Sequence, residues 1–265
     1  MQPSLRTRFF YARKHLAKLV RYGGFRQRCD VCGRRARAFR AFDARSRSRP
    51  GGVIPPVVFP NSVCPWCEAN LRHRLLWRVV GPRLCARVTE LSRPVQVLHF
   101  APEAQIRPLI QATMGVAYVS SDITRTDVDL RLDMTCLALP DAAFDVAIAV
   151  HVLEHIPDDR RAIGELFRVL APGGWAALMV PLLGAVTQED PTVDSDEERV
   201  RRYGQSNHVR MYGMDFGDRL RAVGFEVEAL HYTDVFQDRA ERHSQHEMEG
   251  VLFLATKPFS SVEAR

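Results

Sequence analysis

The sequence lacks an uninterrupted apolar run of the roughly 20 residues that a membrane-spanning helix needs. Its longest candidate, residues 175–186, is broken by Pro181 and Gly184. The basic N-terminal stretch has neither the apolar core nor the small-residue cleavage site of a secretory signal. These absences predict a cytoplasmic protein with no transmembrane segment.

Cysteine is scarce, yet four of the six cysteines form two C-x₂-C pairs, Cys29 with Cys32 and Cys64 with Cys67. Two such turns can aim four thiolates at one point, as a tetrahedral zinc ion requires. An iron–sulfur centre and redox chemistry are the alternatives, while disulfides are disfavoured in a cytosolic chain. Because four cysteines leave no open coordination position, the pattern predicts structural Zn²⁺ in a zinc-ribbon-like module, residues 29–70.

Acidic residues are rare in the first third of the chain. Residues 1–94 contain 21 Lys and Arg against 4 Asp and Glu, whereas the remainder contains 16 against 27. This asymmetry predicts an anionic partner for the front part, such as RNA, a phosphate-rich substrate or a membrane surface. A solvated basic face without a partner is the alternative. Residues 1–28 are expected to form a basic helix, with Phe9, Ala12, Leu16 and Leu19 on its apolar face.

Glycine is missing where a dinucleotide-binding turn would need it, because no G-x-G-x-x-G occurs. What the chain does contain is a βαβ pattern. The apolar run at residues 145–150 fits a strand covered on both faces, Asp158 can cap a following helix, and residues 172–174 (PGG) precede a second strand at 175–180. The pattern predicts an α/β fold with a mostly parallel sheet.

The strand that begins with Asp145, followed by HVLEHIPDD, ELFRVLAPGGW and another apolar strand, resembles class I S-adenosylmethionine-dependent methyltransferases of the type 11 group. The resemblance covers residues 94–258. It implies a Rossmann-like sheet whose last strand is antiparallel, and S-adenosylmethionine as cofactor. The remaining boundaries are then a helical connector of two helices at 71–93 and a tail at 259–265.

The first strand, residues 95–100, departs from the family pattern in the turn that follows it. The sequence is VLHFAPEAQI, with His99 where an acid is usual and Ala101 and Glu103 where glycines are usual. Glu103 can pair with the ammonium group of the cofactor, and Asp122 at the end of the next strand can accept the ribose hydroxyls. By resemblance, the cofactor-binding residues are His99, Ala101, Glu103, Asp122, Ile123, Asp133, Met134 and His151.

The acceptor end is predicted from the polar residues after the fourth strand and in YGQSNHVRMYG. His208 is the candidate general base, together with His151, because imidazole titrates near neutrality. The alternative is a structural loop in which polar side chains anchor the acidic segment at 190–202. The candidate substrate-binding residues are His155, Tyr203, Arg210 and Tyr212.

Three functions follow. The first is a methyltransferase for an unidentified acceptor, with a small molecule or glycan favoured because no stacking aromatics accompany the front arginines. The second is an RNA methyltransferase that uses the basic zinc module. The third is a non-catalytic binding protein whose altered turn has lost the cofactor.

Overall fold

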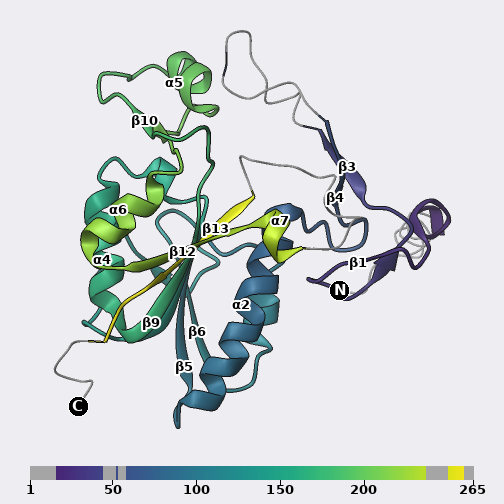
Figure 1. The fold of residues 1–265 in the computed structure, drawn as a ribbon, viewed down its shortest axis with the longest axis horizontal. Coiled ribbons are helices and arrows are strands. Elements are labelled where there is room, and N and C mark those ends of the chain that lie inside the picture. The colour runs from purple at the N-terminus through teal and green to yellow at the C-terminus, as the bar shows by residue number, and fades with distance from the viewer. Residues whose placement is uncertain (1–15, 44–51, 53–57, 237–249, 260–265) are drawn as a thin grey trace.

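The computed structural model describes residues 16–43, 52, 58–236 and 250–259. Its centre is a seven-stranded sheet in the order β12-β13-β9-β8-β5-β6-β7 (Figure 1). Only β13 runs in the direction opposite to the other six strands, which confirms the predicted Rossmann-like class. The strands are β5 (Val95–Phe100), β6 (Val116–Asp122), β7 (Leu130–Arg131), β8 (Phe144–Val150), β9 (Leu170–Met179), β12 (Glu226–His231) and β13 (Val251–Thr256).

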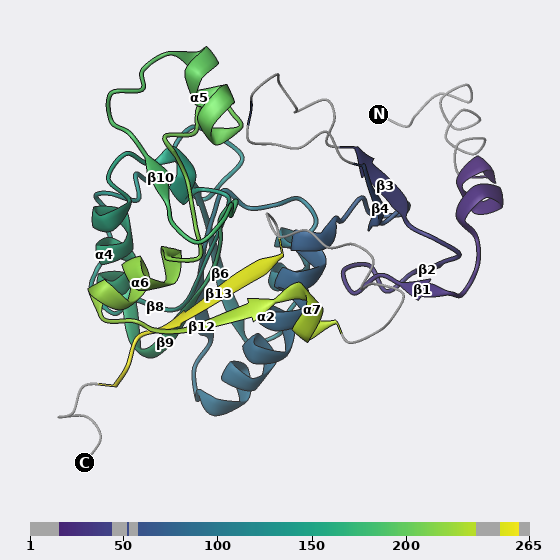
Figure 2. The ribbon, with the colours of Figure 1, turned by 45° about the horizontal axis from the view of Figure 1, so that its top comes forward.

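Helices cover both faces of this sheet, with α2 on one side and α4 and α6 on the other (Figures 1 and 2). The central strands are apolar throughout because both of their faces are buried. Their residues alternate between two cores: Val146 and Ile148 face α2, while Ala147 and Ala149 face α4. The helices are α2 (Leu71–Glu90), α3 (Arg107–Gln111), α4 (Asp159–Val169), α5 (Asp196–Tyr203), α6 (Phe216–Val223), α7 (Tyr232–Val235) and the 3₁₀ turn η2 (Leu153–His155).

The predicted pair of connector helices is one continuous helix, α2, with Pro82 inside it. A proline within a helix costs roughly 3 kcal/mol. Val80 and Leu84 on either side of it are completely buried, and burying such side chains contributes about 1.5–3 kcal/mol each. The packing on both sides of Pro82 therefore offsets the break that its local sequence favours.

Helix α4 begins as predicted, since the Asp158 side chain accepts a hydrogen bond from the Arg161 amide. It ends earlier than predicted, at Val169, and the PGG segment lies within β9. The Lys257 ammonium group donates to the carbonyls of Phe167 and Leu170 at this helix end. A cation from the far end of the chain thus satisfies carbonyls that the helix leaves open.

The front module consists of two small antiparallel sheets beside α2 (Figure 2). The composition of residues 41–60, rich in Arg, Ser, Pro and Gly, predicts a loop. Instead, their two ends pair as strands, with Phe42 opposite Phe59; residues 44–51 and 53–57 are not described. Residues 16–22 are helical, as predicted, whereas Phe9 and Ala12 lie outside the described residues. The strands are β1 (Gln27–Arg28), β2 (Arg35–Ala36), β3 (Arg40–Asp43) and β4 (Val58–Val63).

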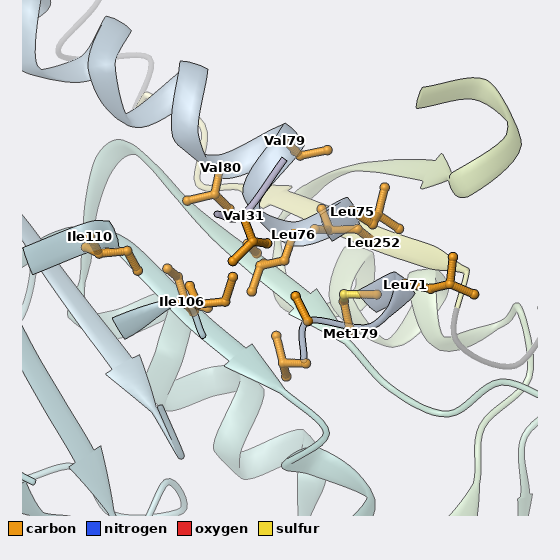
Figure 3. Close-up of a cluster of buried hydrophobic side chains, with 14 of the residues drawn as sticks. Val31, Leu71, Leu75, Leu76, Val79, Val80, Ile106, Ile110, Met179 and Leu252 are labelled. Carbon is orange, nitrogen blue, oxygen red and sulfur yellow. The ribbon is translucent and has the colours of Figure 1, made fainter. Parts of the chain in front are cut away.

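The front module and the sheet share one core, drawn in Figure 3. Val31 of the module packs with Leu75 and Leu76 of α2, and the same cluster continues to Ile106 and Met179. The front module therefore has no separate core among the described residues. No helix in the described ranges is long and apolar enough to cross a membrane.

Candidate functional site

Three neighbouring parallel strands end together at one edge of the sheet. Phe100 lies opposite Ser121 in β6 and opposite Ala149 in β8. Ala101 and His151 follow β5 and β8, and Asp122 is the last residue of β6, so these three residues meet at the carboxyl edge. Open α/β sheets bind their ligands at this edge.

The turn after β5 keeps a left-handed backbone without glycine. Ala101 has φ 45°, and its amide donates to the Ser121 carbonyl at 2.7 Å. A side chain in this region costs roughly 1 kcal/mol. The expected glycine position thus retains its conformation, and the turn is locked to the neighbouring strand.

His99 and Glu103 form a buried pair beneath this turn. The His99 side chain is fully buried; its Nε2 lies 2.9 Å from Glu103 Oε2 and its Nδ1 lies 3.1 Å from the Tyr118 hydroxyl. Burial by itself raises the pKa of Glu103, but His99 outweighs it and the pKa lies below its usual 4.5. His99, predicted to contact the cofactor, instead supports the acid four residues later.

Only one of the two carboxylate oxygens of Glu103 has a hydrogen-bond partner among the described residues. Oε1 is buried and has no hydrogen-bond partner within the described residues. A buried anionic oxygen without a partner is costly unless a cation or donor reaches it. The carboxylate therefore fits the ammonium group of an amino-acid-like ligand.

Asp122 ends β6 with one carboxylate oxygen engaged. Its Oδ1 accepts from the Thr124 amide at 2.8 Å, the Thr124 hydroxyl at 3.1 Å and the Arg125 amide at 2.9 Å. These bonds hold the pKa of Asp122 below its usual value, although burial opposes them. Ile123 follows with 58% of its surface exposed. A fixed carboxylate beside an exposed apolar side chain suits a ribose and an aromatic base.

The predicted adenine-side residues lie on the adjoining loop. The Leu132 amide donates to the Asp122 carbonyl, which ties this loop to the end of β6. Asp133 Oδ1 accepts from the Thr135 amide and hydroxyl, both at 2.8 Å, and these bonds lower its pKa. Met134 is 4% exposed and packs in the core beside α4. Asp133 lies at the surface of the loop, whereas Met134 belongs mainly to the core.

A second polar cluster lies beyond β8. His151 has φ 55° and its amide donates to the Met179 carbonyl. Its Nδ1 lies 3.2 Å from Oε1 of the completely buried Glu154. His155 and His208 stack edge to face at 4.8 Å. Burial lowers the pKa of His208, so its imidazole is neutral at pH 7.

Arg210 and Tyr212, predicted to bind substrate, face into the protein. Arg210 is 4% exposed and donates to the carbonyls of Leu153, Ile156 and Pro157 and to Glu189. The Tyr212 hydroxyl is buried and donates to Asp159 at 2.7 Å. Their hydrogen-bonding groups are engaged internally, so both side chains hold η2 in place. Tyr203, also predicted, is 2% exposed.

The part of the chain that contains these strands is similar to known proteins. Residues 83–178 match a family model described as "Methyltransferase domain". Together with the strand order and the three strand ends, this match decides the family. Residues 83–178 belong to a class I S-adenosylmethionine-dependent methyltransferase domain.

Individual relatives of this methyltransferase domain match shorter stretches. The 27-O-demethylrifamycin SV methyltransferase of Amycolatopsis mediterranei (strain S699) is 36% identical over 110 residues, 40% of this chain and 39% of that protein. The ajmaline N-methyltransferase of Rauvolfia serpentina is 33% identical over 81 residues, 30% and 27% of the two chains. The chain thus spans well under half of either relative. A solved structure, Burkholderia thailandensis 1,6-didemethyltoxoflavin-N1-methyltransferase, has TM-score 0.45 and 15% identity, covering 68% of this chain and 79% of that one.

The four cysteines in front of the methyltransferase domain converge. Cys29 Sγ lies 3.7 Å from Cys67 Sγ, Cys32 Sγ lies 3.8 Å from Cys64 Sγ, and all four sulfurs lie within 4.8 Å of one another. Zinc–sulfur bonds of about 2.3 Å make the edge of a regular tetrahedron about 3.8 Å. The sulfur spacing therefore fits a tetrahedral metal ion.

Both cysteine turns have the same backbone hydrogen bond, from an amide four residues later to the carbonyl of the first cysteine. The Gly33 amide donates to the Cys29 carbonyl and the Glu68 amide donates to the Cys64 carbonyl. Gly33 has φ 70°, as its position predicts, and Glu68 has φ 65° without being glycine. The pKa of the Cys64 thiol is lowered to about 2 because Cys29 and Cys67 donate hydrogen bonds to its thiolate.

Many front arginines contact their own protein. Arg37 donates to the Arg21 carbonyl, and Arg78 pairs with Asp30 at 3.0 Å. Arg74 is fully buried and donates to the Ser62 carbonyl. These contacts account for part of the charge excess, and an anionic partner for the rest stays a prediction.

The sequence predicts that His151, Glu154 and His155 lie at the carboxyl end of a strand, but we assigned a role only to the histidines, including His208, and none to Glu154. The signal was present, since Glu154 lies between two histidines in HVLEH. The fold adds two facts. Glu154 is completely buried, and its carboxylate lies within 4.8 Å of ring nitrogens of His155 and of His208, which comes 54 positions later in the chain.

Proposed function

We propose that this protein transfers the methyl group of S-adenosylmethionine to a small-molecule acceptor. The observation that carries the proposal is the placement of two carboxylates, Glu103 after β5 and Asp122 at the end of the neighbouring strand β6, with Ile123 exposed beside Asp122. Glu103 Oε1 would receive the ammonium group, and Asp122 the ribose hydroxyls. When bound, the sulfonium group supplies an activated methyl.

The protein's own residues would bind and align the reactants. The Ala101 turn fixes the amino-acid end of the ligand against β6, and Ile123 offers an apolar face to the adenine. His151 lies after β8 at the same edge, where an acceptor would approach the methyl group. Alignment in a partly dehydrated site can supply a large part of the rate enhancement of such a displacement.

A small-molecule acceptor is supported by two observations. The matched relatives are named for 27-O-demethylrifamycin SV and ajmaline, which are small molecules. Among the described front arginines, Arg74 is fully buried and donates to the Ser62 carbonyl, so it is not open to an anionic partner. Both observations favour a small acceptor over RNA.

We also propose that the four cysteines hold structural Zn²⁺. The support is the match between the sulfur spacings of 3.7 and 3.8 Å and the edge of a ZnS₄ tetrahedron. Four thiolates fill the coordination sphere, so the ion would stabilise the module without taking part in methyl transfer.

Calorimetric titration with S-adenosylmethionine and S-adenosylhomocysteine tests the cofactor site. Losing two hydrogen bonds to a charged group costs about 3 kcal/mol, so Asp122→Ala should weaken binding roughly 100-fold. Asp218→Ala, which removes an exposed carboxylate of α6, is the matched control and should bind like the parent. Absence of binding by the folded, zinc-loaded parent would refute the proposal and favour a non-catalytic binding protein.

A further inference from the structure

The cluster beyond β8 offers the atoms of a metal site. Glu154 and His155 come from η2, and His208 comes from the segment before β11 (Arg210–Met211). Each offers one ligand atom, and these atoms lie within 4.8 Å of one another. Two imidazoles and one carboxylate form a ligand set suited to divalent transition metals.

The two imidazoles are oriented by the backbone. His155 Nδ1 lies 3.1 Å from the Asn207 carbonyl, and His208 Nδ1 lies 2.8 Å from the Tyr203 carbonyl. A carbonyl oxygen can only accept, so Nδ1 carries the hydrogen in each ring and Nε2 keeps its lone pair. Metal-binding histidines usually have this arrangement, in which a second hydrogen bond fixes the tautomer and the ring.

The atoms that face the cluster are buried without hydrogen bonds. Among the described residues, both carboxylate oxygens of Glu154 and Nε2 of His208 have no hydrogen-bond partner. His151 Nδ1 lies 3.2 Å from Glu154 Oε1, within ion-pair distance but not aligned as a hydrogen bond. A completely buried carboxylate in this state is costly unless it is paired or coordinates a metal.

We propose that Glu154, His155 and His208 bind one divalent transition-metal ion of the zinc, manganese or cobalt class. This site is separate from the cysteine cluster and differs from it in chemistry, since it contains no sulfur. Metal bonds of about 2.1 Å place neighbouring ligand atoms about 3–3.5 Å apart. The ligand atoms all lie within 4.8 Å of one another, so side-chain rotation can bring them to these distances on binding.

Three protein ligands leave positions open for a further ligand, and this part of the inference rests on the proposed methyl transfer. An ion held by these three residues would lower the pKa of an acceptor hydroxyl bound at an open position. His151 Nε2, which is buried without a partner in the described chain, would accept the proton of this hydroxyl. The acceptor oxygen forms a bond to the methyl carbon, the carbon–sulfur bond breaks, and its electron pair stays on sulfur. The acceptor class is then a hydroxyl compound, and His208 is a ligand instead of the general base.

The test is calorimetric titration with Co²⁺ of the full chain, loaded with one equivalent of zinc for its four cysteines, together with its absorption spectrum. The parent is expected to bind one Co²⁺ per chain without the intense sulfur-to-metal bands that a thiolate site produces. His208→Ala should weaken this binding at least about 100-fold, the upper end of the loss caused by removing an orienting partner alone. His231→Ala, at an exposed position of β12, should change nothing.

Two further measurements keep the outcomes distinct. Glu154→Gln preserves shape and should also lose Co²⁺ binding, so it replaces His208→Ala if that variant does not fold. Titration of the same samples with S-adenosylmethionine separates the metal site from the proposed methyl transfer. Metal binding without cofactor binding would support the metal site and contradict the methyl transfer. Absence of Co²⁺ binding by the parent, or equal affinity in parent, His208→Ala and Glu154→Gln, would overturn the metal site.

Discussion

Replacement of Arg210 by methionine should destabilise the protein by about 3 kcal/mol. The guanidinium group is 4% exposed and donates to three carbonyls of the segment Leu153–Pro157. The Tyr212 hydroxyl, 3.4 Å from the Leu153 carbonyl, already donates its one hydrogen to Asp159. The carbonyls of Leu153, Ile156 and Pro157 therefore lose their donor; Leu153 is buried whereas Pro157 is exposed, and an orphaned buried group costs about 1–3 kcal/mol.

The acids around Arg210 have a second cationic partner, so removing Arg210 does not leave them unpaired and adds little to the expected loss of stability. Arg219 lies 2.7 Å from Glu189 and 2.9 Å from Asp159, so both carboxylates retain a cation in the variant. Methionine preserves much of the apolar stem. The loss of about 3 kcal/mol corresponds to a fall of roughly 10 °C in the unfolding midpoint for a chain of this size.

Urea unfolding followed by tryptophan fluorescence measures the loss. Arg210→Lys keeps the charge but cannot reach all three carbonyls, so its stability should fall between those of the parent and Arg210→Met. Arg201→Met, at an exposed ion pair of α5, should lie within about 1 kcal/mol of the parent. If Arg210→Met also lies within 1 kcal/mol, the carbonyl contacts do not hold η2 and the reasoning fails.

Two other predictions concern the cysteines and the buried acid. Cys64→Ser, or removal of metal by a chelator, should lower the midpoint of the whole chain by roughly 10 °C or more, because Val31 shares a core with α2; Cys85→Ser, at an exposed free cysteine, is the control. Thermal unfolding with and without chelator measures this, and a midpoint unmoved by metal loss would contradict the shared core. Glu103 has a lowered pKa, so its stabilisation is present above about pH 4.5 and disappears as pH falls through that lowered value. The difference in unfolding free energy between the parent and Glu103→Gln should therefore become smaller as the pH falls, as urea titrations from pH 7 to pH 3 would show. A difference independent of pH would count against an ionised Glu103.

The elements that sequence predicted well have strong local signals. The first strand, β5, has the predicted bounds because its apolar run is bounded by a proline before it and by a polar turn after it. Asp158 caps α4, and Gly33 takes positive φ, because each needs only its near neighbours. The order of the sheet followed from resemblance, since pairing between distant strands leaves no local mark in one sequence.

Elements that depend on distant packing could not be predicted. Pro82 reads as a break, and only the burial of Val80 and Leu84 against the sheet shows why α2 continues. Arg210 resembled an anion-binding residue because the sequence gives its charge but not the direction of three carbonyls 53 to 57 positions earlier in the chain. Such contacts join segments that meet only in the folded protein.

Four departures from local rules lie along one edge of the sheet. Ala101 and His151 have positive φ without being glycine, at the ends of β5 and β8. Glu103 and Glu154 have buried oxygens without hydrogen bonds in the same two regions of the described chain. Each feature costs about 1–3 kcal/mol, and the pairs with His99 and His151 compensate only part of the cost at Glu103 and Glu154. Unbalanced costs gathered at one edge are expected where ligands supply the missing contacts. A cation at Glu103 and a metal at Glu154 would compensate two of them, which links the cofactor end and the acceptor end of one site.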